Sequence, residues 1–420
     1  NLYVTGYFNS SSAAFGAHTL TNSSSSDTDL FLAKYTSQGS VQWALNAVGT
    51  DDDASRAITT DGEDNILIVG DFASPTITLA GQVIPNVGGT DILVAKFNPQ
   101  GQLVWARNAG YSAINDGNAI AVDAANNVYI AGKLWGSVRF GATELDSHFD
   151  HDTFLAKYNA NGDLQWARQL NSFSVTVARN LAVDADGTLI MAGYLDQTCD
   201  FDHITVAAHG SQDVFLAKFD QEGDVLWARN FGGPGADTPR SLAVDSARNI
   251  YVAGSFEQTA DFGGVTLTTS GQRDTFVVAC DSSGQVSWAK QAGGTRSDDG
   301  FALATGPNNE VVVGGSYSAT INFDAAAYAS NDSSADGYLA YLAASTVTPA
   351  VELNCPWPGN QLEIRGTVGT AIAVQSVTDL TLQPDWQTLT NFVLQTSPTV
   401  FTDPQPPVLQ HKFYRAVIQP

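Results

Sequence analysis

Residues 152–170 read DTFLAKYNANGDLQWARQL, and residues 213–231 repeat the pattern as DVFLAKFDQEGDVLWARNF. In both stretches, two short apolar runs flank a turn made of Asn, Asp, Glu and Gly. Short runs rich in Phe, Leu, Val and Trp around a polar turn are typical of β-strands joined as a hairpin. Because the pattern recurs along most of the chain, the repeat decides the fold class.

Four landmarks recur in a fixed order about every 61 residues. They are a Trp-Ala pair, an Ala-Val-Asp element, an apolar run closed by Gly, and the Asp that opens the F-L-A-K segment. The recurring tryptophans are Trp43, Trp105, Trp166, Trp227 and Trp288, and the recurring aspartates are Asp29, Asp91, Asp152, Asp213, Asp274 and Asp336. We expect each Trp to pack between repeats and each Asp to cap a loop amide, because a unique catalytic group is rarely copied in every repeat.

The repeat predicts an all-β protein, since no stretch has a sustained helical period. Four short strands per repeat fit a β-propeller of four-stranded blades. Six blades follow if half a repeat precedes Asn1, and seven if one and a half repeats do. Within the turns, we expect a positive φ at Gly39 and its counterparts. We also expect an aspartate-bonded turn between Asp61 and Asn65.

The order D-x-F-L-A-K-Y, G-x-x-x-W-A, A-V-D, N-x-Y-V-x-G and F-G resembles the bacterial SBBP-type β-propeller repeat over residues 1–342. The last copies depart from it, because the lysine of the F-L-A-K segment is replaced by Ala279 and Tyr341. The resemblance implies a secreted or surface-exposed bacterial protein and transfers no catalytic residue.

We predict three parts: a propeller over 1–342, a linker over 343–350 (AASTVTPA) and a C-terminal domain over 351–420. The last part lacks the repeat landmarks and contains alternating segments such as IAVQSV (residues 372–377). This pattern favours a small immunoglobulin-like β-sandwich. It resembles β-domains at the ends of secreted bacterial proteins, which implies anchoring, secretion or assembly.

Charge and composition exclude several classes of protein. The chain of 420 residues has a formal net charge of -24, which argues against nucleic acid as a partner. No apolar run reaches the roughly 18 residues of a membrane-spanning helix. Three cysteines are too few for a disulfide framework, and few charges with one Met are typical of a secreted β-protein.

Two groups of side chains are candidate metal ligands. The stretch DSHFDHD contains Asp146, His148, Asp150 and His151, whose spacing suits a divalent metal; a solvated loop is the alternative. A second group shares one repeat position and comprises Asp53, Asp237 and Asp298, with Asn115 and Thr176 in the other copies. We expect these side chains to cap turns, and the alternative is a Ca²⁺ site, since Ca²⁺ takes oxygen ligands. No other cofactor is predicted.

No nucleophile elbow, P-loop or dinucleotide motif occurs in the sequence. We therefore expect a non-enzymatic extracellular structural or interaction protein. The segment NLYVTGYF (residues 1–8) carries no charged side chain to protect an exposed strand edge. We therefore expect that either upstream residues of the same chain or a neighbouring copy covers this edge. The second case gives a homo-oligomer or fibre joined there or through the C-terminal domain. The alternatives are a carbohydrate-binding propeller with glycan partners and a polysaccharide-degrading enzyme.

Overall fold

The computed structural model describes residues 1–22, 26–111, 114–172, 174–306, 310–323, 326–330, 335–342, 351–354, 361–366, 371–377, 387–393, 399–402 and 413–418. The side chains of residues 148–150 and 326, and those after 342 except Thr388, lie outside this description. Within the described ranges every regular element is a β-strand, as predicted. In this part of the chain no helix has the length and hydropathy needed to cross a membrane.

The first three repeats contain strands β1 to β15. The first repeat comprises β1 (Leu2–Phe8), β2 (Ser12–Phe15), β3 (His18–Thr21), β4 (Asp29–Tyr35) and β5 (Val41–Val48). The second comprises β6 (Asp53–Thr60), β7 (Ile66–Phe72), β8 (Thr76–Leu79), β9 (Gln82–Pro85), β10 (Asp91–Phe97) and β11 (Leu103–Tyr111). The third comprises β12 (Asn115–Val122), β13 (Val128–Phe140), β14 (Thr143–Tyr158) and β15 (Leu164–Ser172).

The following repeats contain strands β16 to β30. The next comprises β16 (Thr176–Val183), β17 (Leu189–Leu195), β18 (Thr198–Phe201), β19 (Ile204–Ala207), β20 (Asp213–Phe219) and β21 (Val225–Phe231). It is followed by β22 (Thr238–Val244), β23 (Ile250–Phe262), β24 (Val265–Cys280) and β25 (Val286–Gly293). The last repeat comprises β26 (Asp299–Thr305), β27 (Val311–Ser318), β28 (Thr320–Phe323), β29 (Ala326–Ala329) and β30 (Ala335–Leu342).

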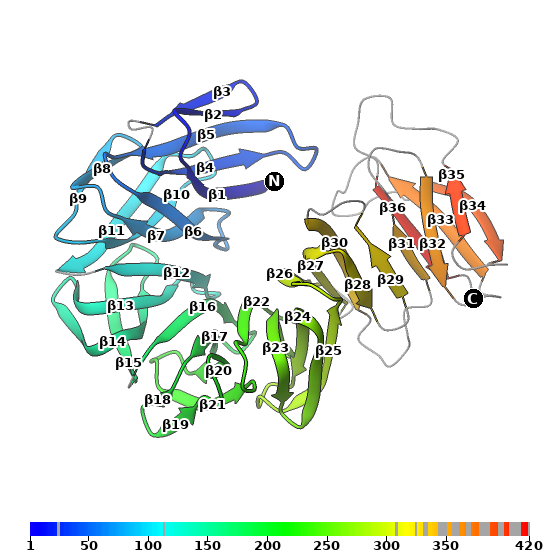
Figure 1. Ribbon diagram of the computed structural model, residues 1–420. Helices are drawn as coiled ribbons and strands as arrows, with labels where there is room; N and C mark the ends of the chain where they lie inside the picture. The colour runs from blue at the N-terminus through cyan, green and yellow to red at the C-terminus, as the bar shows by residue number, and fades with distance from the viewer. Residues whose placement is uncertain are drawn as a thin grey trace. The chain divides into compact units, whose positions relative to one another are not determined.

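Each complete repeat forms four antiparallel strands in chain order, as in β16–β17–β20–β21 (Figure 1). The A-V-D strands β6, β12, β16, β22 and β26 are the first strands of their repeats, and neighbouring members of this series lie against one another. The apolar core lies between consecutive repeats: Leu216 of β20 shares a cluster with Ile250 and Val252 of β23. Each repeat therefore buries its apolar face against the next one.

The sequence analysis missed a second hairpin between the second and third strands of each repeat. This hairpin is β8–β9 or β18–β19 in two repeats and an extension of the main strands in β13–β14 and β23–β24. It pairs with the Trp-Ala strand of the preceding repeat, for example at Ala47↔Leu79 and Ser172↔Cys199. Strand pairing thus joins neighbouring repeats in addition to apolar packing.

The turn predictions are confirmed. The turn glycines Gly39, Gly101, Gly162, Gly223 and Gly284 have φ of 80°, 80°, 77°, 85° and 78°. Asn65 donates from its backbone N and its Nδ2 to the two carboxylate oxygens of Asp61, at 2.9 Å each.

The C-terminal residues form two three-stranded sheets. One has the order β31 (Val351–Asn354), β32 (Gln361–Gly366) and β35 (Thr399–Thr402). The other has the order β34 (Gln387–Val393), β33 (Ala371–Val377) and β36 (Phe413–Ile418). The chain divides into two compact parts: one contains Tyr3–Lys34 and Trp43–Ala340, and the other contains Asn1–Leu2, Tyr35–Gln42 and Tyr341–Pro420. The predicted linker over 343–350 lies outside the described residues.

Candidate functional site

The junctions between repeats hold polar contacts that recur from one repeat to the next. Lys34 Nζ and Trp43 Nε1 both donate to the backbone carbonyl of Pro99, at 2.7 and 3.3 Å. Pro99 lies in the turn of the next repeat. Lys96 and Trp105 share the carbonyl of Ala160 in the same way, as do Lys218 and Trp227 the carbonyl of Ser282. One carbonyl therefore anchors two side chains of the preceding repeat.

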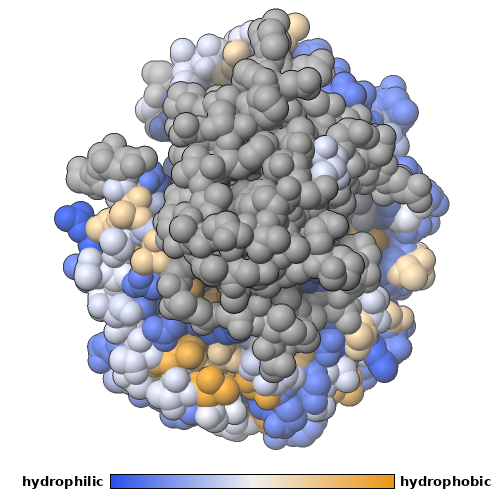
Figure 2. All heavy atoms as spheres, turned by 90° about the vertical axis from the view of Figure 1, so that its right-hand side faces the viewer, coloured by the Kyte–Doolittle hydropathy of each residue, from blue (hydrophilic) through white to orange (hydrophobic). Residues whose placement is uncertain are grey.

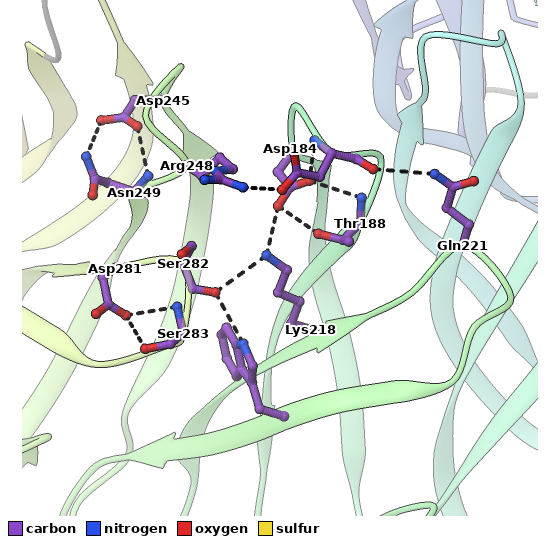
Figure 3. Close-up of polar contacts among 12 residues, drawn as sticks. Asp184, Thr188, Lys218, Gln221, Asp245, Arg248, Asn249, Asp281, Ser282 and Ser283 are labelled. Carbon is purple, nitrogen blue, oxygen red and sulfur yellow. Dashed lines mark hydrogen bonds and ion pairs between the residues drawn. The ribbon is translucent and has the colours of Figure 1, made fainter.

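Lys218 also links this junction to its own repeat. Its Nζ lies 2.8 Å from Asp184 Oδ2 and 3.4 Å from the carbonyl of Ser282 (Figure 3). Burial alone raises the pKa of Asp184, but hydrogen bonds from Lys218 and Thr188 outweigh burial and hold the pKa below its usual value. Lys96 and Asp61 form the same ion pair at 2.7 Å in an earlier repeat. Each buried pair connects a turn and a strand of one repeat to the backbone of the next.

The recurring tryptophans contact the turn glycine of the next repeat. At Gly162, where φ is 77°, a Cβ atom would lie 2.7 Å from the Trp105 ring. This distance is below van der Waals contact, so the close approach requires glycine. Trp105 is 6% exposed, and the described tryptophans at this repeat position before Trp288 contact Gly101, Gly162, Gly223 and Gly284.

The aspartates that open the F-L-A-K strands accept hydrogen bonds from loop amides. Asp91 accepts from Val87 N at 3.1 Å, Asp213 from His209 N at 2.8 Å and Asp274 from Ser270 N at 2.9 Å. Each is buried, and burial raises the pKa of Asp274 to about 6. At Gly110 a Cβ atom would lie 1.7 Å from Asp91 Oδ1, so this carboxylate packs directly on the glycine.

The acidic group proposed for Ca²⁺ occupies equivalent buried positions in separate repeats. Asp237 accepts from Gly233 N at 2.8 Å and Glu257 N at 3.2 Å, and Asp53 accepts from Ser74. Burial raises the pKa of Asp53 and Asp237 to about 7 and that of Asp298 to about 6. Asn115 and Thr176 are also buried. Among the described residues, no group of three or more His, Cys, Asp or Glu is arranged to hold a metal ion.

The DSHFDHD segment lies in β14, within the long extension that it forms with β13. Asp146 Oδ1 accepts a hydrogen bond from Ser137 Oγ at 3.0 Å, and the ring of His151 lies 5.2 Å from that of Trp135. The side chains of His148 and Asp150 lie outside the described residues. A metal at this segment therefore stays a prediction.

Cys199 and Cys280 are buried as free thiols, and burial raises the pKa of each to about 12. Both thiols are therefore protonated at neutral pH. Cys355 lies outside the described residues.

One group of residues was missed by the sequence analysis. Arg179, Arg240 and Arg273, with Tyr194, line a pocket of about 200 Å³. Arg179 and Arg240 are separated by one repeat length, but the repeat pattern does not reveal that the side chains meet at one pocket.

The comparisons with known proteins agree with the repeat. Residues 226–255 match the SBBP beta-propeller repeat model. An uncharacterized WD repeat-containing protein of Acanthamoeba polyphaga mimivirus is 23% identical over 373 residues, which cover 70% of this chain and 26% of that protein. The regulatory protein FlaEY of Caulobacter vibrioides is 32% identical over 148 residues, which cover 34% of this chain and 16% of that protein. The chain thus spans a minor part of both relatives.

Two solved structures are also similar. A protein of unknown function from Bacteroides caccae has a TM-score of 0.31 and 11% identity, covering 65% of this chain and 78% of that one. A luciferin-regenerating enzyme has a TM-score of 0.34 and 11% identity, covering 68% of this chain and 80% of that one. The 61-residue repeat, the all-β architecture and the matched repeat model lead to one conclusion: this chain is a β-propeller repeat protein.

Proposed function

We propose that this chain is a non-enzymatic extracellular interaction protein whose repeats form a scaffold and which assembles with further copies of itself. The observation that carries the proposal is an apolar face at each end of the repeat series. Figure 2 shows small hydrophobic groups among hydrophilic residues on one side of the molecule. Propeller repeats in general serve protein–protein contacts, which is consistent with such a role.

The first face belongs to β30 in the last repeat. Leu339 of β30 corresponds by repeat position to Leu216 of β20, which is fully buried against Ile250 and Val252 of the following repeat. Leu339 is 79% exposed. The partner that suits this face is therefore a strand with β-branched side chains at the positions of Ile250 and Val252.

The second face belongs to β1 in the first repeat. Val4 corresponds by repeat position to Ile68, which is fully buried in a cluster with Leu32 of the preceding repeat. Val4 is 42% exposed, and β1 is the end strand of the order β1–β4–β5–β8–β9. The hairpin β2–β3 also forms a two-stranded sheet, whereas its counterparts pair with a Trp-Ala strand of the preceding repeat.

By repeat position, the two faces correspond to the two sides of an internal junction, at which Leu32 packs with Ile68. A β30 face on one copy therefore matches the β1 face of a second copy, with Leu339 in the place of Leu32 and Val4 in the place of Ile68. Such a contact is heterologous, and repeated addition produces a ring or a fibre. We propose this head-to-tail contact as the assembly mode.

Light scattering on the full chain tests the assembly. Wild-type protein should form species larger than the 44.3 kDa monomer. Leu339→Arg and Val4→Arg should each give monomers, and an equimolar mixture of the two should give dimers, because each variant keeps one intact face. Leu226→Arg is the control, since Leu226 is 49% exposed on β21 away from both faces, and this variant should assemble normally.

A wild-type monomer at micromolar concentrations would overturn the assembly proposal. A mixture of Leu339→Arg and Val4→Arg that stays monomeric would overturn the pairing of the two faces. Neither result would affect the description of the repeats as an interaction scaffold, which a screen for bound protein and glycan partners tests separately.

The finer architecture belongs to the same proposal. We infer six four-stranded blades if half a repeat precedes Asn1, or seven if one and a half repeats do, and a C-terminal immunoglobulin-like sandwich. The sandwich is supported by the two sheets β31–β32–β35 and β34–β33–β36. The absence of catalysis is supported by the engagement of the buried aspartates with backbone amides and by the protonated thiols.

A further inference from the structure

The pocket lined by Arg179, Arg240 and Arg273 is positively charged, whereas the chain as a whole is acidic. The sequence holds 43 Asp and Glu against 19 Lys and Arg, yet three arginines from two neighbouring repeats line one pocket of about 200 Å³. Tyr194 and Pro239 contribute apolar surface to the same pocket. Positive charge is therefore concentrated at one place in an acidic protein.

β-Bulges place two of these arginines. Strands β16 and β17 pair Ala178 with Gly193 and Asn180 with Ala192, so Arg179 is the extra residue between two ladder positions. Arg240 is the extra residue between Pro239 and Ser241 in the pairing of β22 with β23. Bulges of this kind redirect a side chain and are frequent beside binding sites.

The same bulge occurs in the other repeats but carries different residues. It holds Arg56 in the pairing of β6 with β7, Asn118 in that of β12 with β13, and Phe301 in that of β26 with β27. Arg56 is already paired with Asp71. The combination of two arginines on consecutive bulges is therefore confined to the β16–β17 and β22–β23 pairs.

The guanidinium groups that line the pocket have N–H donors available for a ligand. Within the described part of the chain, neither Arg179 nor Arg240 forms an ion pair; Arg179 lies 5.4 Å from the ring centroid of Tyr194. Arg273 Nη2 donates to Asp299 Oδ2 at 2.8 Å, whereas its buried Nε has no hydrogen-bond partner among the described residues. A buried donor without a partner costs free energy unless a ligand satisfies it.

We propose that this pocket binds the carboxylate group of a small organic acid. The planar guanidinium fork matches a carboxylate in a bidentate geometry, and two such forks converge on the pocket. A pocket of about 200 Å³ admits a compact acid such as a single sugar acid. The carboxylate of Asp299 and the net charge of -24 disfavour polyanions.

Calorimetry on the full chain with sodium glucuronate and sodium acetate as probes tests the proposal. Both carboxylates should bind, whereas glucose, which matches glucuronate in size without the charge, and potassium chloride at equal ionic strength should not. Heats for glucuronate and acetate no larger than that of potassium chloride would overturn the site. Inorganic phosphate binding more tightly than both would overturn the carboxylate assignment.

Substitutions locate the binding. Arg179→Gln and Arg240→Gln should each weaken glucuronate binding at least tenfold, with circular dichroism spectra like that of the wild type. Arg168→Gln is the matched control, because Arg168 is exposed and pairs with Asp224 outside the pocket, and it should bind like the wild type. Unchanged affinity in the Arg179→Gln, Arg240→Gln double variant would overturn the assignment to this pocket.

Discussion

Strands β20 and β30 carry the same sequence pattern and differ completely in burial. β20, DVFLAKF, is buried at every residue, whereas β30, ADGYLAYL, is exposed at every second residue. The difference lies in the neighbours, because β20 has the following repeat packed against it. A strand of this repeat thus obtains its burial from the next repeat, and the junction is the unit of stability.

A second comparison concerns the turn aspartates Asp184 and Asp245, both drawn in Figure 3. Asp184 accepts from Lys218, which extends to the next repeat. Asp245 stands in a repeat where Ala279 replaces that lysine, and it accepts from Tyr251 and Asn249 of its own repeat instead. The carboxylate holds its own turn in both cases, but only the lysine makes it part of a junction.

The largest expected effect comes from removing a junction tryptophan. Trp105→Ala should lower the free energy of unfolding by about 3–5 kcal/mol, the usual cost of a large-to-small core change. Trp135→Ala should lower it by about 1 kcal/mol, because Trp135 is 47% exposed and only about half of its side chain loses contacts. Urea denaturation measures both, and equal losses would contradict the junction as the unit of stability.

The next largest loss of stability should come from replacing the buried Lys218. Lys218→Met leaves the Asp184 carboxylate without its cation and should cost about 3 kcal/mol, as for a broken buried ion pair. Lys34→Met should cost about 1–2 kcal/mol, since Lys34 donates to the carbonyl of Pro99 and no ion pair is described for it. Thermal unfolding measures both losses. If the two variants had the same melting temperature, the ion pair of Lys218 with Asp184 would contribute nothing to the stability of the junction.

The turn glycines sharpen the comparison further. Gly162→Ala and Gly81→Ala both place an alanine at positive φ, with φ of 77° and 85°, at a cost of about 1–2 kcal/mol. The added methyl at Gly162 also meets the Trp105 ring, whereas no described atom lies within 4 Å at Gly81. Gly162→Ala should therefore cost about 1 kcal/mol more, measured by thermal unfolding, and equal costs would argue against contact of Trp105 with this turn.

The sequence was sufficient to predict the elements whose residue types, as well as their positions, recur from repeat to repeat. Strand composition, the turn glycines and the turn of Asp61 with Asn65 depend on local chemistry, so one copy predicts the others. The hairpin β8–β9 was not predicted, because its sequence, TITLAGQVIP (residues 76–85), has no landmark that all copies share. Its role depends on pairing with the preceding repeat, which the local pattern does not contain.

The pocket could not be predicted for a related reason. Arg179 and Arg240 are ordinary polar positions in their own strands, and only the one-residue register shift of the bulge sets them apart. A register shift leaves the 61-residue spacing unchanged, so it is invisible in the sequence. The metal ligands predicted at Asp146, His148, Asp150 and His151 and the Ca²⁺ at Asp53, Asp237 and Asp298 stay predictions.

The smallest expected effect is a dependence of stability on pH at the buried carboxyl of Asp237. Burial raises its pKa in the folded protein to about 7, against the ordinary value of 3.8 for an aspartate. Between these values the folded state binds a proton that the unfolded state has released, so stability is highest at the acidic end and falls as the pH rises. For this one group the loss from pH 6 to pH 7 should be about 1 kcal/mol.

Asp237→Asn should reduce that loss, because an amide does not titrate. Gly233 and Glu257 donate to different oxygens of Asp237, so the single oxygen of Asn keeps one of these hydrogen bonds, and the variant should be less stable at both pH values. Asp224→Asn is the matched control, since Asp224 is 62% exposed and its ion pair with Arg168 lies at the surface. Thermal unfolding of the three proteins at pH 6 and pH 7 measures the difference. If the wild-type protein and the Asp237→Asn variant had the same dependence on pH, this carboxyl would be ionised in the folded protein, and the buried charge would need a compensating cation.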